Sequence, residues 1–224
     1  MNANFELIIF DCDGVLVDSE VISCRAHAET LTRHGYPITA DEVFDRFLGR
    51  SMRKATLEIE AELGRRLPDD FHAQVYAEIF RLFAASLEAT PHIDAALAAI
   101  MMPVCVASSG PPEKISTSLN HVGLYDRFAP HIFSAVQVKN DKPAPDLFLF
   151  AAEQMRTPPE RCLVIEDSLA GVTGALAAGM MVFGYHGGSH CRPDTADTLR
   201  AAGAAVTFDD MRQLPDLIGR IGAD

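Results

Sequence analysis

The stretch Phe5-Glu6-Leu7-Ile8-Ile9-Phe10-Asp11-Cys12-Asp13-Gly14 begins as an apolar run and ends in two carboxylates one residue apart, followed by a glycine. A short apolar run that stops at a turn signal is typical of a central strand in a parallel sheet, covered on both faces. Ligands of open α/β sheets bind beyond the carboxyl ends of the strands. We therefore expect Asp11 and Asp13 to hold a cation or to act as nucleophile and acid/base, because unpaired carboxylates beside a core are costly. These residues alone leave open an ordinary Asp-Gly turn.

The composition excludes several classes of partner. The 224 residues include 31 acidic and 19 basic side chains, which give a formal net charge of −12. Nucleic acids and anionic membranes both attract basic surfaces, so we expect neither as a partner. No apolar run reaches the length of a membrane span and no secretory signal is recognisable, which predicts a cytoplasmic protein. We further expect a monomer.

Two parts of the chain differ in their periodicity. Residues 19–87 show helical spacing with almost no strand signal, and the predicted helices cover about 21–34, 40–47, 51–63 and 68–87. This pattern predicts a helical domain over 19–87. The α/β core would then comprise residues 1–18 and 88–224.

After the helical segment, strand and helix patterns alternate. Strands are predicted at 103–107, 131–134, 162–165, 181–183 and 205–208. Helices are predicted at 113–122, 145–155 and 169–178, with one more at the C-terminus. Alternation of this kind predicts an α/β fold with a doubly wound, Rossmann-like parallel sheet.

Polar residues recur where these strands end. Ser108 closes one strand, and Ser109-Gly110 opens a turn whose hydroxyl and free backbone N–H groups suit an anionic oxygen. Lys142 stands before Pro143 and Pro145 in a stretch that leads into a helix, and Glu166-Asp167 ends a strand that we expect beside the first one. Each signal alone is also typical of a turn or a solvated loop, but together they predict one site. Hard oxygen ligands in such a site suit Mg²⁺.

These residues resemble four motifs of the haloacid dehalogenase superfamily of Mg²⁺-dependent phosphoryl-transfer enzymes. Asp11-Cys12-Asp13-Gly14-Val15 is similar to the first motif, Ser108 to the second, Lys142 to the third and Glu166-Asp167 to the fourth. The helical insert after the first motif resembles the cap of one subclass, which includes β-phosphoglucomutase and many sugar-phosphate phosphatases. The similarity is greatest to 6-phosphogluconate phosphatase-like members.

The resemblance implies a role for each motif residue. Asp11 would attack phosphorus to form an aspartyl-phosphate, and Asp13 would protonate the leaving oxygen and then activate water. Ser108 and Lys142 would hold the transferring phosphoryl oxygens, beside a substrate-binding turn at Ser109-Gly110. The substrate would be a small phosphorylated metabolite.

The resemblance also implies a metal site. Mg²⁺ would be held by Asp11, the backbone carbonyl of Asp13 and Asp167. For Glu166, direct ligation and an orienting role outside the coordination sphere remain open, and we favour the second.

Sequence details discriminate among family members. Asp13 argues for phosphate chemistry, since true dehalogenases lack a second aspartate. Ser23 stands where β-phosphoglucomutase carries a histidine in the first cap helix, which favours hydrolysis over the mutase reaction. A phosphomutase remains the alternative. A third hypothesis is a non-enzymatic receiver-type phosphoacceptor domain. Such domains lack a large helical insert, so residues 19–87 count against it.

Two further features concern loops. The cap is expected to determine substrate specificity. In Phe47-Leu48-Gly49-Arg50-Ser51, Arg50 is the candidate to bind a second anionic group of the substrate. The alternative is that Arg50 is a solvated loop arginine. The segment His186-Gly187-Gly188-Ser189-His190-Cys191 lacks the regular spacing of a metal site. We interpret it as a structural or surface loop.

Overall fold

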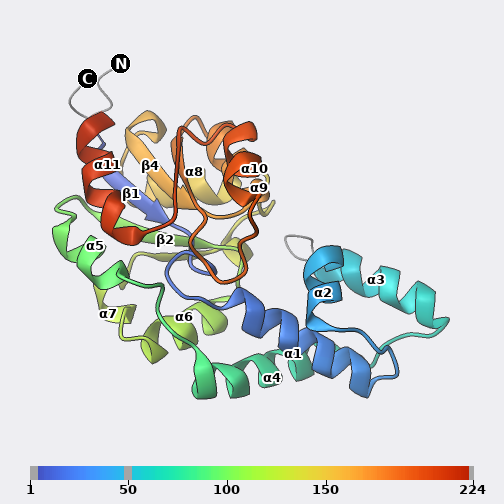
Figure 1. Cartoon of the computed structure of the whole chain (residues 1–224). Helices are drawn as coiled ribbons and strands as arrows, with labels where there is room; N and C mark the ends of the chain where they lie inside the picture. Colours follow the sequence, from blue (N-terminus) through green and yellow to red (C-terminus); the bar gives the residue numbers. More distant parts are fainter. Residues whose placement is uncertain (1–4, 48–51, 222–224) are drawn as a thin grey trace. The chain divides into compact units, whose positions relative to one another are not determined.

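The computed structural model describes residues 5–47 and 52–221. The chain divides into two compact units, with boundaries between Asp18 and Ser19 and between Leu87 and Glu88. Figure 1 shows an α/β unit and a unit made of helices.

The α/β unit is built on a six-stranded parallel sheet of order β3-β2-β1-β4-β5-β6. Its strands are β1 (Leu7–Phe10), β2 (Val104–Ser108), β3 (Ile132–Ser134), β4 (Cys162–Glu166), β5 (Met181–Tyr185) and β6 (Val206–Phe208). Every residue of β1 is buried, as expected of a central strand. The predicted doubly wound α/β fold is confirmed.

Helices cover both faces of this sheet (Figure 1). They are α5 (Ile93–Ala99), α6 (Pro112–His121), α7 (Tyr125–Phe128), α8 (Asp146–Gln154), α9 (Leu169–Ala177), α10 (Thr195–Ala201) and α11 (Leu214–Ile221), with 3₁₀ turns η1 (Ala135–Gln137), η2 (Pro159–Arg161) and η3 (Met211–Gln213). Ile9 packs in one core cluster with Leu147 of α8 and Val172 of α9. Phe10 points to the opposite face, where its ring lies 6.0 Å from that of Phe128 in α7. Period-two alternation therefore divides β1 between two cores.

The helical unit consists of α1 (Glu20–Arg33), α2 (Ala40–Phe47), α3 (Met52–Leu63) and α4 (Phe71–Ser86). Helix α1 packs against α2 and α4, and α4 buries an apolar face that includes Val75 and Ile79. Ion pairs such as Arg33 to Glu78, at 3.1 Å, link α1 and α4.

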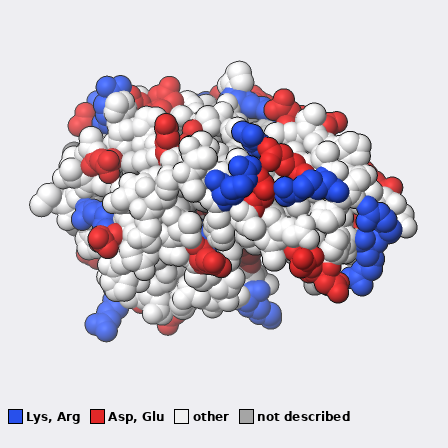
Figure 2. Space-filling model, turned by 90° about the horizontal axis from the view of Figure 1, so that it is seen from below, with Lys and Arg blue, Asp and Glu red and all other residues white. Residues whose placement is uncertain are grey.

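On the face drawn in Figure 2, basic side chains lie among acidic ones.

The sequence analysis located the six strands and the longer helices but missed three short helices. Helices α5, α7 and α10 were not predicted, because four to seven residues are too few to display helical periodicity. Within the described residues, no helix has the length and apolar character needed to cross a membrane.

Candidate active site

The site lies where β1 and β4 end side by side. Phe10 pairs with Ile165 across the two strands, and the N–H of Asp11 donates to the Ile165 carbonyl at 3.0 Å. This register brings Asp11 next to Glu166 and Asp167, which confirms that the fourth motif follows a neighbour of the first strand. Cys12 turns the other way into the core and is fully buried.

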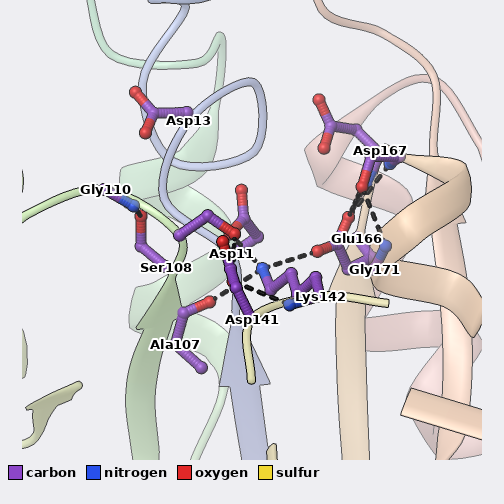
Figure 3. Close-up of polar contacts among 12 residues, drawn as sticks. Asp11, Asp13, Ala107, Ser108, Gly110, Asp141, Lys142, Glu166, Asp167 and Gly171 are labelled. Carbon is purple, nitrogen blue, oxygen red and sulfur yellow. Dashed lines mark hydrogen bonds and ion pairs between the residues drawn. The ribbon is translucent and has the colours of Figure 1, made fainter. Parts of the chain in front are cut away.

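Lys142 is the centre of the polar network (Figure 3). Its ammonium donates to Asp11 Oδ1 at 2.5 Å, Glu166 Oε1 at 2.7 Å and the Ala107 carbonyl at 3.0 Å. The side chain is only 4% exposed, and Nζ lies 5.1 Å from the centre of the Phe148 ring. A lysine has three N–H donors, and protein acceptors engage all of them here. A phosphoryl oxygen must therefore replace one of these acceptors to bind Lys142 directly.

The charges of this cluster are strongly perturbed. Burial raises the pKa of Asp11 well above its ordinary value, Lys142 opposes that rise, and Glu166 and Asp167 add to it. Burial alone would lower the pKa of Lys142, but the charges of Asp11 and Glu166 raise it above its ordinary value. The lysine is therefore a permanent cation, and the carboxylates around it are held together at an energetic cost that a further cation would reduce.

Glu166 is engaged through both of its oxygens. Oε1 accepts from Lys142, while Oε2 accepts from the N–H groups of Asp167 and Ser168 and from the Ser168 hydroxyl, at 2.9–3.0 Å. A side chain on Gly171 would overlap the Glu166 carboxyl group, so the glycine leaves the room that this carboxylate occupies. This full set of bonds favours an orienting role over direct metal ligation.

The turn after β2 differs in part from its prediction. The N–H of Gly110 donates to Ser108 Oγ at 3.0 Å, and the next two residues, Pro111 and Pro112, have no N–H. The N–H group of Gly110, which the sequence analysis expected to be free, is therefore used within the turn. Ser108 can still donate its own hydroxyl proton, but Ser109 is exposed and donates its hydroxyl to Asp141 at 2.8 Å.

Asp13 has a partner that the sequence did not reveal. Lys114 of α6 places Nζ 2.7 Å from Asp13 Oδ1, and the two side chains are 11% and 13% exposed. A signal was present, because Lys114 falls in the first turn of a helix, where the dipole disfavours a cation. Such a lysine is expected to have an anionic partner elsewhere in the fold.

Asp167 also has an unforeseen partner. His190 Nε2 lies 2.9 Å from Asp167 Oδ2, and both side chains are less than a tenth exposed. Burial lowers the pKa of His190, but its bonds to Asp167 and Cys191 raise it to about 11. The loop over 186–191 is anchored again by Asp18, which accepts from the N–H and hydroxyl of Ser189 at 3.2 and 2.8 Å. This loop, which the sequence analysis interpreted as structural or surface, thus contacts the site through His190.

Gly14 is required by this geometry. It has φ +78°, and a side chain there would overlap Asp167 Oδ2 and crowd His190. The glycine of the first motif therefore lets the chain pass closely beside Asp167.

The donor set fits Mg²⁺. Lys142 engages Oδ1 of Asp11 and His190 engages Oδ2 of Asp167, and in the part of the chain that the structure describes neither remaining oxygen has a hydrogen bond. No group of three or more His, Cys, Asp or Glu side chains suited to a metal occurs among the described residues. Two carboxylates, one carbonyl and waters are nevertheless the usual environment of Mg²⁺.

Two positions that the sequence analysis discussed lie elsewhere in the chain. Arg50 lies outside the described residues. Ser23 is buried in α1, within the helical unit.

Comparison with known proteins identifies the family. The sequence profile of the haloacid dehalogenase-like hydrolases matches residues 5–179. The chain belongs to this family. Among haloacid dehalogenase-like hydrolases, it is 35% identical to the 6-phosphogluconate phosphatase of Escherichia coli (strain K12), over 96% of this chain and 95% of that protein. It is 32% identical to a phosphorylated carbohydrates phosphatase of Thermotoga maritima, over 78% of this chain and 82% of that protein.

A solved structure agrees with this assignment. A haloacid dehalogenase-like protein from Agrobacterium tumefaciens str. C58 is 38% identical and superposes with a TM-score of 0.84, covering 98% of this chain and all of that one. The family match and the named phosphatases confirm the expected enzyme class, a phosphoric monoester hydrolase.

Proposed function

We propose that the protein is a Mg²⁺-dependent phosphatase that hydrolyses a small phosphorylated metabolite, a sugar phosphate or sugar-acid phosphate, through an aspartyl-phosphate. The observation that carries this proposal is the contact of Asp11 with Lys142 at 2.5 Å, beside Asp167, where β1 and β4 end. Residues 1–18 and 88–224 would form the catalytic core, and residues 19–87 the cap.

Asp11 acts as the nucleophile in this proposal. Lys142 binds Oδ1 of the Asp11 carboxylate and offsets its charge, and one of the two carboxylate oxygens attacks phosphorus. Asp11, Asp167 and the carbonyl of Asp13 would hold Mg²⁺, which when bound offsets the repulsion between the carboxylates and a phosphate dianion. Ser108 would donate its hydroxyl to a phosphoryl oxygen.

Asp13 acts as general acid and then as general base. It gives a proton to the leaving oxygen as the phosphoryl group moves to Asp11, and takes one from the water that releases phosphate from Asp11. Its position two residues after the nucleophile places both carboxylates at the same strand end (Figure 3).

Hydrolysis is favoured over phosphomutase chemistry. Ser23 lacks the ring nitrogen that the mutase resemblance requires in the first cap helix. The two similar curated proteins are named as phosphatases of 6-phosphogluconate and of phosphorylated carbohydrates. Arg50 remains the proposed contact for a second anionic group, such as a sugar-acid carboxylate.

A phosphate-release assay over sugar phosphates, sugar-acid phosphates and nucleotides tests the proposal. We expect release from sugar or sugar-acid phosphates, loss of release when Mg²⁺ is chelated, and a fall of about 10⁴-fold or more in kcat for Asp11→Asn. Asp126→Asn, at an exposed aspartate of α7, is the control and should keep full activity. Normal turnover by a folded Asp11→Asn protein, or isomerisation of substrate without phosphate release, contradicts the proposal.

A further inference from the structure

Lys114 occupies a position that its own helix disfavours. It lies in the first turn of α6, where the helix dipole opposes a cation. Its ammonium nevertheless approaches Asp13 Oδ1 to 2.7 Å, in a contact where both side chains are nearly buried. We infer that Lys114 is a positioning residue, which orients the Asp13 carboxylate so that Oδ2 exchanges the proton with the leaving oxygen. This inference rests on the proposed phosphatase function.

The second oxygen of Asp13 faces the turn after β2. A methyl group built on Gly110 would lie 3.6 Å from Asp13 Oδ2 and 3.3 Å from Ser108 Oγ. These two oxygens therefore border the same small space, which Gly110 leaves open by having no side chain. Because Lys114 binds Oδ1, the two oxygens of Asp13 have different surroundings, and Oδ2 is the one directed at the turn that would receive the phosphoryl group.

The proton balance assigns no chemical step to Lys114. In the first step an oxygen of Asp11 bonds to phosphorus, and the bond from phosphorus to the bridging oxygen breaks. The bridging oxygen keeps the electron pair of that bond and takes the Oδ2–H proton of Asp13. In the second step a water oxygen bonds to phosphorus, the bond to Asp11 breaks, and Asp13 Oδ2 takes the water proton. General acid catalysis needs the proton donor within hydrogen-bond reach of the leaving oxygen. By holding Oδ1, Lys114 would keep Oδ2 in that position, and this is its whole role in the reaction.

The alternative is that Lys114 only fastens the loop after β1 to α6. The nature of the leaving group separates the two roles. A sugar alkoxide needs protonation as it departs, whereas p-nitrophenolate departs without it. Both substrates share the second step, but kcat/KM reports only the steps up to transfer of the phosphoryl group to Asp11. In kcat/KM, misorienting Asp13 should therefore impair alkyl phosphates selectively, whereas a general loosening of the site should impair alkyl and aryl phosphates alike.

The experiment compares kcat/KM of Lys114→Met on p-nitrophenyl phosphate and on the sugar phosphate that the wild type hydrolyses best. We expect a loss of about 10²-fold on the sugar phosphate and a change within about threefold on the aryl phosphate. The control Lys139→Met, at an exposed lysine of the same unit, should change neither value. If Lys114→Met does not fold, Lys114→Ala, which also removes the donor to Asp13 Oδ1, provides the same ratio.

Equal losses on both substrates, or no loss on the sugar phosphate, overturn the inference. Failure of the proposed function is distinguishable, because it shows in the wild type and in Asp11→Asn before any change at Lys114. The positioning role is supported by one outcome, in which Lys114→Met keeps its activity on p-nitrophenyl phosphate and loses its activity on the sugar phosphate.

Discussion

Replacing Lys142 by methionine tests the electrostatic design of the site. The change removes a cation that is 4% exposed and bonds Asp11, Glu166 and the Ala107 carbonyl. Methionine is unbranched and of similar length, but it leaves two buried carboxylates without their shared counter-ion.

The expected loss of stability is large. Removing one partner of a buried ion pair costs about 3–5 kcal/mol, because the remaining charge stays desolvated. For a chain of this size, each kcal/mol lowers Tm by about 2–4 °C. We therefore expect Lys142→Met to melt about 6–20 °C below the wild type at pH 8, when thermal unfolding is followed by circular dichroism.

The loss of stability in Lys142→Met should be smaller at lower pH. Burial raises the pKa of Asp11 above its ordinary value of 3.8, and Lys142 is the group that opposes this rise. In the variant, the folded state therefore binds a proton on Asp11 more readily than the unfolded state does. Stability is then greatest below the unfolded pKa and falls as the pH rises through the folded pKa. The difference in Tm from the wild type should be smaller at pH 5 than at pH 8.

A second substitution provides the control. Asp11→Asn removes one of the two buried carboxylates that lack a counter-ion in Lys142→Met. The double variant Lys142→Met/Asp11→Asn should therefore be more stable than Lys142→Met at pH 8. A Tm for Lys142→Met within about 2 °C of the wild type, or a double variant no more stable than the single one, would refute the reasoning.

Two further predictions concern the backbone around the site. Ser168→Ala removes the side-chain cap of α9 and should lower the free energy of unfolding by about 1–2 kcal/mol. The control Ser116→Ala, at an exposed hydrogen bond within α6, should change it by less than about 0.5 kcal/mol. Equal effects of the two substitutions contradict the capping role of Ser168. Gly14→Ala should raise the Kd for Mg²⁺ about 10- to 100-fold by displacing Asp167, as measured by titration calorimetry. Gly123→Ala is its control, since Gly123 also has positive φ but no atom within 4 Å of the added carbon; a similar rise in both variants would point to backbone strain instead.

The amino-acid order was sufficient to predict the sheet and the four motif positions. Leu7–Phe10 is a short apolar run ended by acids, and the strands predicted at 103–107 and 162–165 end in polar residues in the same way. Because parallel strands expose their carboxyl ends at one edge, a local pattern at each strand end implies a common site. Elements long enough to show their period were therefore predicted, whereas α7, with four residues, was not.

The contacts among the site residues depended on the folded chain. Lys114 is 101 residues from Asp13 in the sequence, and no periodicity pairs them. His190 comes from a glycine-containing loop whose path is set by Asp18, and the room for Glu166 depends on Gly171. Periodicity and strand-end chemistry are local properties, so they can be read along the chain. Which oxygen of a carboxylate is held, and by which cation, depends on distances that arise only when β1, β4 and α6 are packed together.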